Sequence, residues 1–318
     1  MKRRRVLPSP REVAADEPRG IMNRRSILNV LAGLAAVPRA RAAGEIVPQR
    51  GIVYSTAGGQ RLALDLWKAP QAGRRPVVLC IHGGAWRGGG REDLAAFAAE
   101  FAAAGFTAVS VSYRLFDPVK SPQHIWPAAF DDVQRAVRWL RENAGVLSID
   151  PGRIVALGAS AGGHLAALLG LRETRKQAGP VALSRHSSRV SGVIDVFGPS
   201  DLTRDFSALR VGGSSVQDVV DDFIGRGKPE EQRAADRRDA SPVMHVDAAS
   251  VPFLIFHGAL DSIVPVEQGR ILDAALRGAG RDCRYVEWAR EGHGLGAPGS
   301  MESFRRETMA FLRKVTAP

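Results

Sequence analysis

The chain has 318 residues, of which 45% are hydrophobic, and it carries a formal charge of +11. This length and composition describe a globular protein with one large domain or two ordinary ones. Residues 1–42 hold ten Lys and Arg against three acidic residues, a net +7, which leaves only +4 for the rest of the chain. Because the remainder has no long basic run and no interleaving of basic and aromatic residues, we expect no nucleic-acid partner.

The two cysteines, Cys80 and Cys283, exclude a disulfide framework. Each lies in an apolar or alternating run that is typical of a strand, so we predict two unpaired and mostly buried thiols. Neither has a second cysteine or a suitably spaced histidine nearby, and we therefore expect no metal site. No motif requires a cofactor.

The N-terminal segment has the three parts of an export signal. A pair of arginines, Arg24-Arg25, precedes an apolar stretch from Ser26 to Val37 and a small-residue end at Ala40-Arg41-Ala42. A helix of 12 residues spans about 18 Å, too short for a bilayer core of about 30 Å, so we expect no stable membrane insertion. The arginine pair resembles a twin-arginine export signal.

We therefore predict that residues 1–42 are an upstream extension and an export signal, and that the protein is periplasmic. Translation starts at Met1 or at Met22, and the residues before Met22 resemble an extension upstream of the true start. The alternative is a disordered basic tail on a cytoplasmic protein.

From Gly51 onward, short apolar runs alternate with segments of helical period, the pattern of an α/β domain with a mostly parallel sheet flanked by helices. Residues 199–250 depart from this pattern: they are polar and broken by glycine and proline, so we expect a short insertion over the sheet inside one domain, residues 43–318. The expected elements, in chain order, are strands at 52–57 and 62–68 joined by a hairpin at Gly58-Gly59, a strand at 77–81, a helix at 92–104, a strand at 107–113, a helix at 130–143, a turn at Asp150-Pro151-Gly152, a strand at 154–157, a helix from 165, strands at 190–197 and 251–256, a helix at 266–278, a strand at 283–288 and a helix at 302–312.

The strand at 154–157 and the helix from Leu165 are joined by Gly158-Ala159-Ser160-Ala161-Gly162. So tight a turn strains the backbone of Ser160, and the flanking glycines let strand and helix approach each other. The serine oxygen then projects above the sheet. In this context the G-x-S-x-G pattern resembles the nucleophile elbow of α/β-hydrolases. The alternative is a glycine-rich turn with an incidental serine.

A second glycine-rich segment, His82-Gly83-Gly84-Ala85-Trp86, follows the predicted central strand at 77–81. Attack of Ser160 on an acyl carbon would place negative charge on the carbonyl oxygen, which backbone N–H groups can stabilise. The segment is similar to the oxyanion loop that accompanies the elbow, and we expect donors at Gly84 and Ala85 and at Ala161, the residue after the nucleophile. The alternative is a plain turn after a strand.

An elbow serine needs a general base and an acid to orient it, and α/β-hydrolases supply them in the chain order Ser, acid, His. Of the seven histidines, only His293 lies beyond a strand-end acid that itself follows Ser160 by a strand and a helix. That acid is Asp261, just past the strand at 251–256. The rival is Asp195, whose two apolar neighbours indicate a place inside the sheet. We expect structural roles for three further histidines: His82, His164 and His257.

Residues 50–314 resemble the esterase/lipase branch of the α/β-hydrolases, close to bacterial feruloyl and acetyl-xylan esterases and to hormone-sensitive-lipase-like enzymes. Ala85 stands where the lipase-like relatives have a third glycine, and Ala159 where many carry an acid, so the first group is favoured. The resemblance implies an α/β-hydrolase fold and hydrolysis of carboxylic esters through an acyl-enzyme on Ser160. It rests on these segments: His82–Trp86, Asp132 with Ala136–Leu140, Ile149–Arg153, Gly158–Leu165, Ala240–Pro242 and His257–Asp261.

The expected substrate is a small-molecule or carbohydrate ester with a short acyl group, because the insertion at 199–250 is short and polar; deacetylation or feruloyl ester cleavage on carbohydrate would fit. A prolyl-oligopeptidase-like peptidase, an amidase or a formamidase is the alternative. The peptidases carry a large N-terminal propeller, which about fifty residues cannot form. A non-catalytic ligand-binding homologue is the second alternative. The oligomeric state is left open.

Overall fold

A computed structural model describes residues 46–174 and 181–317. The predicted export signal at 1–42 lies outside the described residues. None of the described helices combines the length and the apolar character needed to cross a bilayer.

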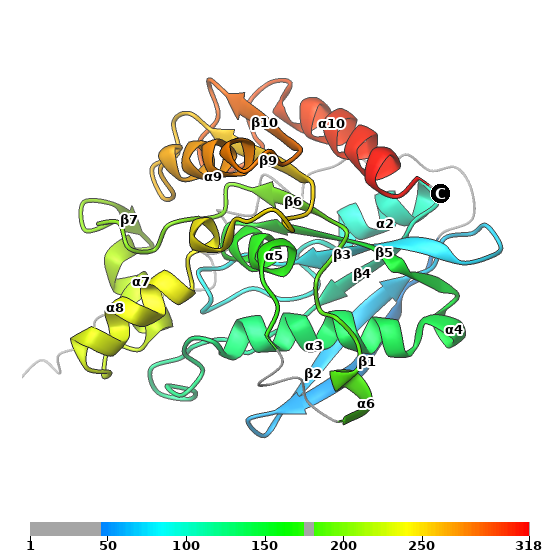
Figure 1. The fold of residues 1–318 in the computed structure, drawn as a ribbon, viewed down its shortest axis with the longest axis horizontal. Helices are drawn as coiled ribbons and strands as arrows, with labels where there is room; N and C mark the ends of the chain where they lie inside the picture. The colour runs from blue at the N-terminus through cyan, green and yellow to red at the C-terminus, as the bar shows by residue number, and fades with distance from the viewer. Residues whose placement is uncertain (1–45, 175–180, 318) are drawn as a thin grey trace, which may run out of the picture.

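Within the described residues, eight strands form one sheet in the order β1-β2-β4-β3-β5-β6-β9-β10, shown in Figure 1. Strand β2 is antiparallel to both of its neighbours, and the other pairs are parallel, as predicted. The strands are β1 (Gln49–Ala57), β2 (Gln60–Trp67), β3 (Arg75–Ile81), β4 (Thr107–Val111), β5 (Ile149–Ala159), β6 (Gly192–Val196), β9 (Phe253–Gly258) and β10 (Cys283–Trp288).

Helices cover both faces of the sheet (Figure 1). One face carries α3 (Ala128–Glu142), α5 (Ala161–Leu171) and α9 (Glu267–Gly278). The other face carries α2 (Ala95–Ala103) and α10 (Ser300–Val315). Two short helices, α4 (Ala144–Leu147) and α6 (Val181–Ser184), lie in connections.

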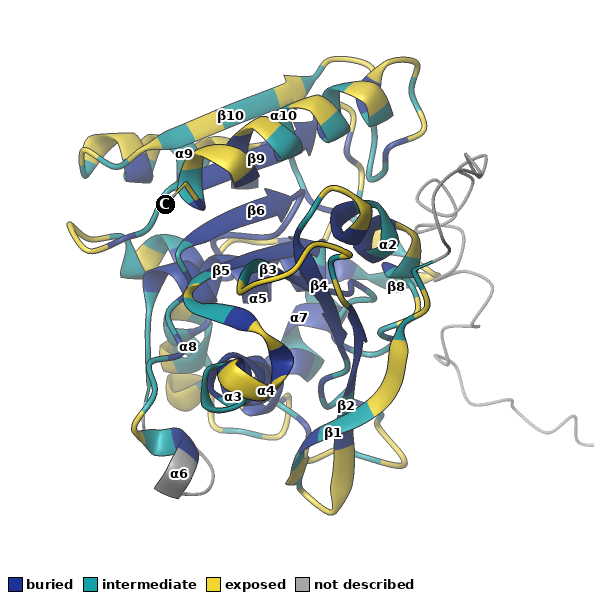
Figure 2. Ribbon diagram, turned by 90° about the vertical axis from the view of Figure 1, so that its right-hand side faces the viewer, coloured by how far each residue is buried: buried dark blue, intermediate teal, exposed yellow. Residues whose placement is uncertain are grey.

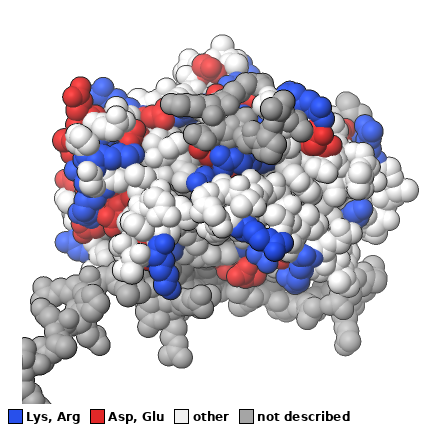
Figure 3. All heavy atoms as spheres, turned by 90° about the horizontal axis from the view of Figure 1, so that it is seen from below, with Lys and Arg blue, Asp and Glu red and all other residues white. Residues whose placement is uncertain are grey.

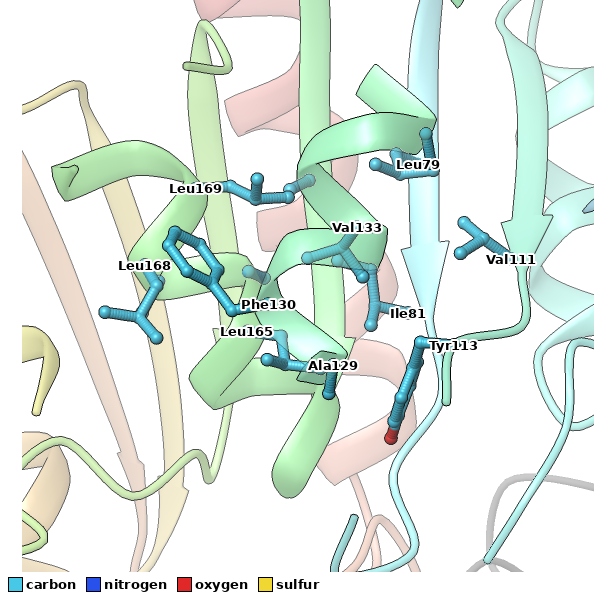
Figure 4. Packing of buried hydrophobic residues seen from close by; sticks show 14 of the residues in the cluster. Leu79, Ile81, Val111, Tyr113, Ala129, Phe130, Val133, Leu165, Leu168 and Leu169 are labelled. Atoms are coloured by element: carbon cyan, nitrogen blue, oxygen red, sulfur yellow. The ribbon is translucent and has the colours of Figure 1, made fainter. Parts of the chain in front are cut away.

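The alternation of side chains along the strands divides the core between the two faces. In β3, Leu79 and Ile81 belong to the cluster with α3 and α5, whereas Val78 and Cys80 belong to the cluster with α2 and α10. Figure 4 shows the first cluster, in which α3 and α5 pack on β3 and β4. Strands β4, β6 and β9 are buried throughout, while the edge strands β1 and β10 consist mostly of intermediate and exposed residues (Figure 2).

Both cysteines are free thiols, as predicted. Cys80 is fully buried, and burial raises its pKa to about 12, so it stays protonated. Cys283 is only half-buried, because β10 lies at the edge of the sheet.

One predicted turn lies inside a strand. Residues 150–152 were expected to precede the elbow strand, but β5 begins at Ile149. Ile149 pairs with Arg75 and Ile154 pairs with Val77, so the residues between them bulge out of the ladder. Within this bulge the Asp150 carboxylate accepts the N–H of Gly152 at 2.8 Å, which keeps the local turn.

The segment between β6 and β9 contains short helices, as expected for an insertion. Basic and acidic side chains alternate at the end of the molecule where α7 and α8 lie (Figure 3), and many of them form ion pairs, such as Lys228 with Asp236 at 2.6 Å. The positive charge is therefore locally neutralised there. The elements are β7 (Arg210–Val211), β8 (Ser214–Ser215), α7 (Val216–Ile224), α8 (Glu230–Asp239) and the 3-10 helix η1 (Pro242–His245).

Candidate active site

Ser160 occupies the sharp turn between β5 and α5, with φ 56° and ψ −124°. Such a conformation costs a non-glycine residue about 1–3 kcal/mol and persists only where the surroundings impose it. A Cβ atom at Gly158 would lie 2.1 Å from the carbonyl oxygen of Gly162, and one at Gly162 would lie 2.0 Å from that of Ile81. Both glycines are therefore required for the turn, and Ser160 is left half-buried at the end of β5.

The predicted oxyanion loop lies against the serine. A Cβ atom at Gly83 would lie 3.4 Å from Cβ of Ser160. Within the described residues, neither Gly84 nor Ala85 donates its N–H to a protein acceptor. Ala161 is the first residue of α5, where an N–H has no partner inside the helix. The three predicted donors thus belong to segments that adjoin Ser160, and their role stays a prediction.

The side chain of His82 is bonded to the backbone of this loop. The ring is buried and donates from Nδ1 to the carbonyl oxygen of Gly83 at 2.8 Å. It stacks on Tyr113 with the ring centroids 4.3 Å apart, and the Tyr113 hydroxyl donates to the His82 carbonyl at 2.9 Å. Burial lowers the pKa of His82, so the ring is neutral and serves as packing and a single donor.

The predicted acid and base are in direct contact. Nδ1 of His293 lies 2.7 Å from Oδ2 of Asp261, and Oδ1 of Asp261 accepts the N–H groups of Ile263 and Val264 at 2.9 and 2.8 Å. Burial by itself raises the pKa of Asp261, but the interaction with His293 and hydrogen bonds from His257 and His293 outweigh it and hold that pKa well below its usual value. Asp261 is therefore a carboxylate that fixes the proton of His293 on Nδ1 and leaves Nε2 as an acceptor.

Sheet topology places the acid–base pair at the same edge as the serine. Strands β5, β6, β9 and β10 are parallel neighbours, so their carboxyl ends lie side by side. Ser160 follows β5, Asp261 follows β9 and His293 follows β10. Phe197, which follows β6, packs on the His293 ring with the centroids 4.4 Å apart. This aromatic contact was not foreseen, because nothing in the local sequence marks it.

The rival acid, Asp195, is placed differently. It lies within β6 and is buried, and its Oδ1 accepts the N–H of Gly198 at 2.9 Å. A Cβ atom at Gly163 would lie 2.3 Å from the same oxygen, so the carboxylate sits against the first turn of α5. Burial raises its pKa to about 6. These contacts are those of a packing residue inside the sheet.

The raised pKa of Asp195 predicts how stability depends on pH. The carboxyl of Asp195 is harder to ionise in the folded chain than in the unfolded chain. Its protonated form therefore contributes to the free energy of unfolding in full below about pH 4, and this contribution is lost as the pH rises through about 6. The free energy of unfolding of an Asp195→Asn variant, relative to that of the wild type, should therefore be higher at pH 7 than at pH 4 by about 2 kcal/mol. Urea unfolding of both proteins at the two pH values checks this, and a constant difference would contradict it.

A second histidine, His257, contacts Asp261, and this contact was not predicted from the sequence. Nε2 of His257 lies 3.4 Å from Oδ2 of Asp261 and 2.9 Å from the carbonyl oxygen of Val264. The ring is fully buried, as its expected structural role requires. His164 is also buried and is held at 2.7 Å from the carbonyl oxygen of Ala240. The described part of the chain contains no group of three or more His, Cys, Asp or Glu residues able to hold a metal ion.

Comparison with known proteins places the chain in a family. The BD-FAE family model matches residues 64–276. The Mycobacterium tuberculosis esterases LipC and LipQ are 32% and 33% identical to the chain over 78% and 70% of its length, which corresponds to 60% and 51% of their own. The chain thus spans about half or somewhat more of the length of these curated relatives.

Solved structures show the same fold. A truncated carbohydrate esterase from gut microbiota superposes with a TM-score of 0.73 at 25% identity, covering 87% of this chain and 99% of the other. Butyrate-bound esterase 2 of Thermogutta terrifontis superposes with a TM-score of 0.68 at 26% identity, covering 86% and 96%. With the family match extending over more than half of its length, the chain belongs to the BD-FAE family and has the α/β-hydrolase fold.

Proposed function

We propose that the protein hydrolyses carboxylic esters through an acyl-enzyme on Ser160. The observation that carries the proposal is the 2.7 Å contact between Asp261 and His293, at the edge of the sheet where the strained turn presents Ser160. Relatives and structural neighbours that are named as esterases support the same reaction.

The reaction follows from the roles of these groups. Nε2 of His293 takes the hydroxyl proton as Oγ of Ser160 bonds to the acyl carbon, and Asp261 stabilises the resulting imidazolium. The N–H groups of Gly84, Ala85 and Ala161 receive the oxyanion; loss of one such donor costs about 3–4 kcal/mol in a related chemistry. His293 then protonates the leaving alcohol, and a water molecule, deprotonated by the same ring, releases the acid and regenerates Ser160.

We further propose a short acyl group as the preferred substrate. The insertion between β6 and β9 consists of short elements, and none of the residues of α8 is buried. The esterase of Thermogutta terrifontis has been solved with butyrate and with propionate, both of them short acids. In a more specific form of this proposal, the alcohol part of the ester is a carbohydrate. The structural similarity to the carbohydrate esterase from gut microbiota, at 25% identity, supports it.

A comparison of leaving groups and acyl lengths tests this function. Purified protein should turn over p-nitrophenyl acetate and butyrate with kcat/KM about 10-fold or more above that for the octanoate, because a pocket that fits a short acyl chain rejects added methylenes. An aminoacyl p-nitroanilide should be cleaved far more slowly. Faster cleavage of the anilide would instead identify a peptidase or amidase, and a folded protein that acts on none of these compounds would be a binding homologue.

We also propose export, on the basis of Arg24-Arg25, the short apolar stretch and Ala40-Arg41-Ala42. Cleavage after Ala42 would make Ala43 the first residue of the mature protein. N-terminal sequencing of protein from its native host should show this residue. A sequence beginning at Met1 or Met22 would rule export by this signal out.

A further inference from the structure

The segment that follows the predicted oxyanion donors is tied to the insertion by an ion pair. The Arg87 guanidinium pairs with the Asp222 carboxylate of α7 and donates a second hydrogen bond to the carbonyl oxygen of Asp218 at 3.1 Å. The Arg87 side chain is 14% exposed and that of Asp222 is 21% exposed. An ion pair shielded to this degree is screened by salt far less than a surface pair.

The neighbouring residues of both segments also meet. Trp86 stacks on Phe223 with the ring centroids 4.2 Å apart and an interplanar angle of 13°. Both rings are buried. Two consecutive residues of the loop therefore contact two consecutive residues of α7, one pair through charge and one through aromatic packing, which defines a single relative position of loop and helix.

Helix α7 is itself held firmly enough to serve as a support. Ser215 caps its first turn, accepting the N–H of Asp218 at 3.0 Å. At its other end, the carbonyl oxygen of Phe223 accepts the N–H of Trp126 at 2.7 Å. Its apolar side chains are buried: Val216, Val219, Val220, Phe223 and Ile224.

The loop needs such support because its own backbone is strained. Ala85 and Trp86 have φ values of 56° and 57°, a region that non-glycine residues avoid, and Gly84 has φ 104°. Its internal hydrogen bonds include those from the N–H groups of Arg87 and Gly88 to the carbonyl oxygen of Gly84. A strained conformation of this kind persists when neighbouring structure imposes it. The direction of the Ala85 N–H depends on these backbone angles.

We propose that Asp222 is a positioning residue for ester hydrolysis: by holding Arg87, it keeps the loop in the conformation that aims the N–H groups of Gly84 and Ala85 at the oxyanion. This inference rests on the function proposed above for Ser160. The insertion thereby contributes to turnover without touching the substrate, and its α7 helix becomes part of the apparatus that stabilises the transition state.

The matched control is Arg226. Its Nε donates to the other oxygen of the same Asp222 carboxylate at 2.9 Å, but its side chain is 51% exposed and it makes no contact with the loop within the described residues. Arg226 also donates to the carboxylate and the carbonyl oxygen of Asp218, so removing its charge disturbs the ion pairs of α7 but leaves the direct contact between Asp222 and Arg87 in place. A comparison of Arg226→Gln with Asp222→Asn therefore distinguishes two effects: the loss of an ion pair within α7, and the loss of the ion pair between α7 and the oxyanion loop.

Two measurements on the full chain test the proposal: kinetics with p-nitrophenyl acetate, and hydrogen–deuterium exchange of residues 83–88. In Asp222→Asn and Arg87→Gln we expect kcat to fall about 10-fold, with KM changed less than 3-fold, because misaligned donors weaken transition-state binding more than substrate binding. Exchange in residues 83–88 should rise in both variants. Arg87→Lys, which keeps the charge, should recover part of kcat, and Arg226→Gln should match the wild type in both measurements.

Unchanged kcat or unchanged exchange in Asp222→Asn would overturn the proposal. So would equal effects of Asp222→Asn and Arg226→Gln, since these would reflect α7 alone. A wild-type protein that hydrolyses no ester would overturn the proposed function instead. In that case the exchange of residues 83–88 would still decide whether Asp222 holds the loop.

Discussion

Replacing Ser160 with alanine is expected to lower kcat for p-nitrophenyl acetate by about 10⁶-fold, the loss found when the nucleophile of a serine protease is removed. The variant keeps the Cβ atom of the turn, while Oγ, the atom that we propose bonds to the acyl carbon, is lost. Oxyanion donors and binding alone then account for the residual rate. Initial-rate kinetics on the folded variant measure the loss.

A fluorophosphonate probe gives a second readout of the same prediction. The wild type should label at Ser160 and the Ser160→Ala variant should not, because rapid labelling requires an adjacent general base. Ser148 supplies a matched control: it also has a positive φ of 57°, but it is exposed and precedes β5 rather than following it. Ser148→Ala should retain full activity and labelling. Persistent labelling of Ser160→Ala would place the nucleophile elsewhere.

Much of the fold could be predicted because its determinants are local. Apolar runs such as 77–81 form buried parallel strands, and the helical period of 130–143 corresponds to α3, most of whose residues are buried. The start of β5 could not be predicted in this way. Strand pairing between Arg75 and Ile149 extends the strand beyond the bulge, and pairing depends on a partner that is distant in the sequence.

The contacts of the candidate site could likewise be predicted only in part. The pairing of Asp261 with His293 was predicted from the order of the elements, because α/β-hydrolases supply the serine, the acid and the histidine in this order along the chain and Asp261 follows a predicted strand. The contacts of Arg87 with Asp222 and of Trp86 with Phe223 were not predicted. They join segments about 135 residues apart through an irregular insertion, where neither periodicity nor strand order specifies which side chains meet.

Asp261→Asn is expected to lower kcat by about 10⁴-fold, the effect of the equivalent substitution in a serine protease. The amide keeps the size of the side chain, and its oxygen can still accept the N–H groups of Ile263 and Val264. Its NH₂ group, however, would donate to Nδ1 of His293 and move the ring proton to Nε2. His293 would then have no free nitrogen to receive the proton of Ser160. Steady-state kinetics on the variant, shown to be folded by circular dichroism, measure this loss.

Asp195→Asn provides the contrast, because the same chemical change is made at a buried carboxyl that contacts Gly198 rather than His293. We expect kcat to change less than about 10-fold, while the dependence of stability on pH changes as derived above. A strand-end substitution can also destabilise the sheet, so both variants are compared on kcat at a temperature where each is fully folded. If Asp195→Asn abolished turnover while Asp261→Asn stayed near the wild-type rate, the acid would be the one in β6. The 2.7 Å contact of Asp261 with His293 would then serve only to hold the loop after β9.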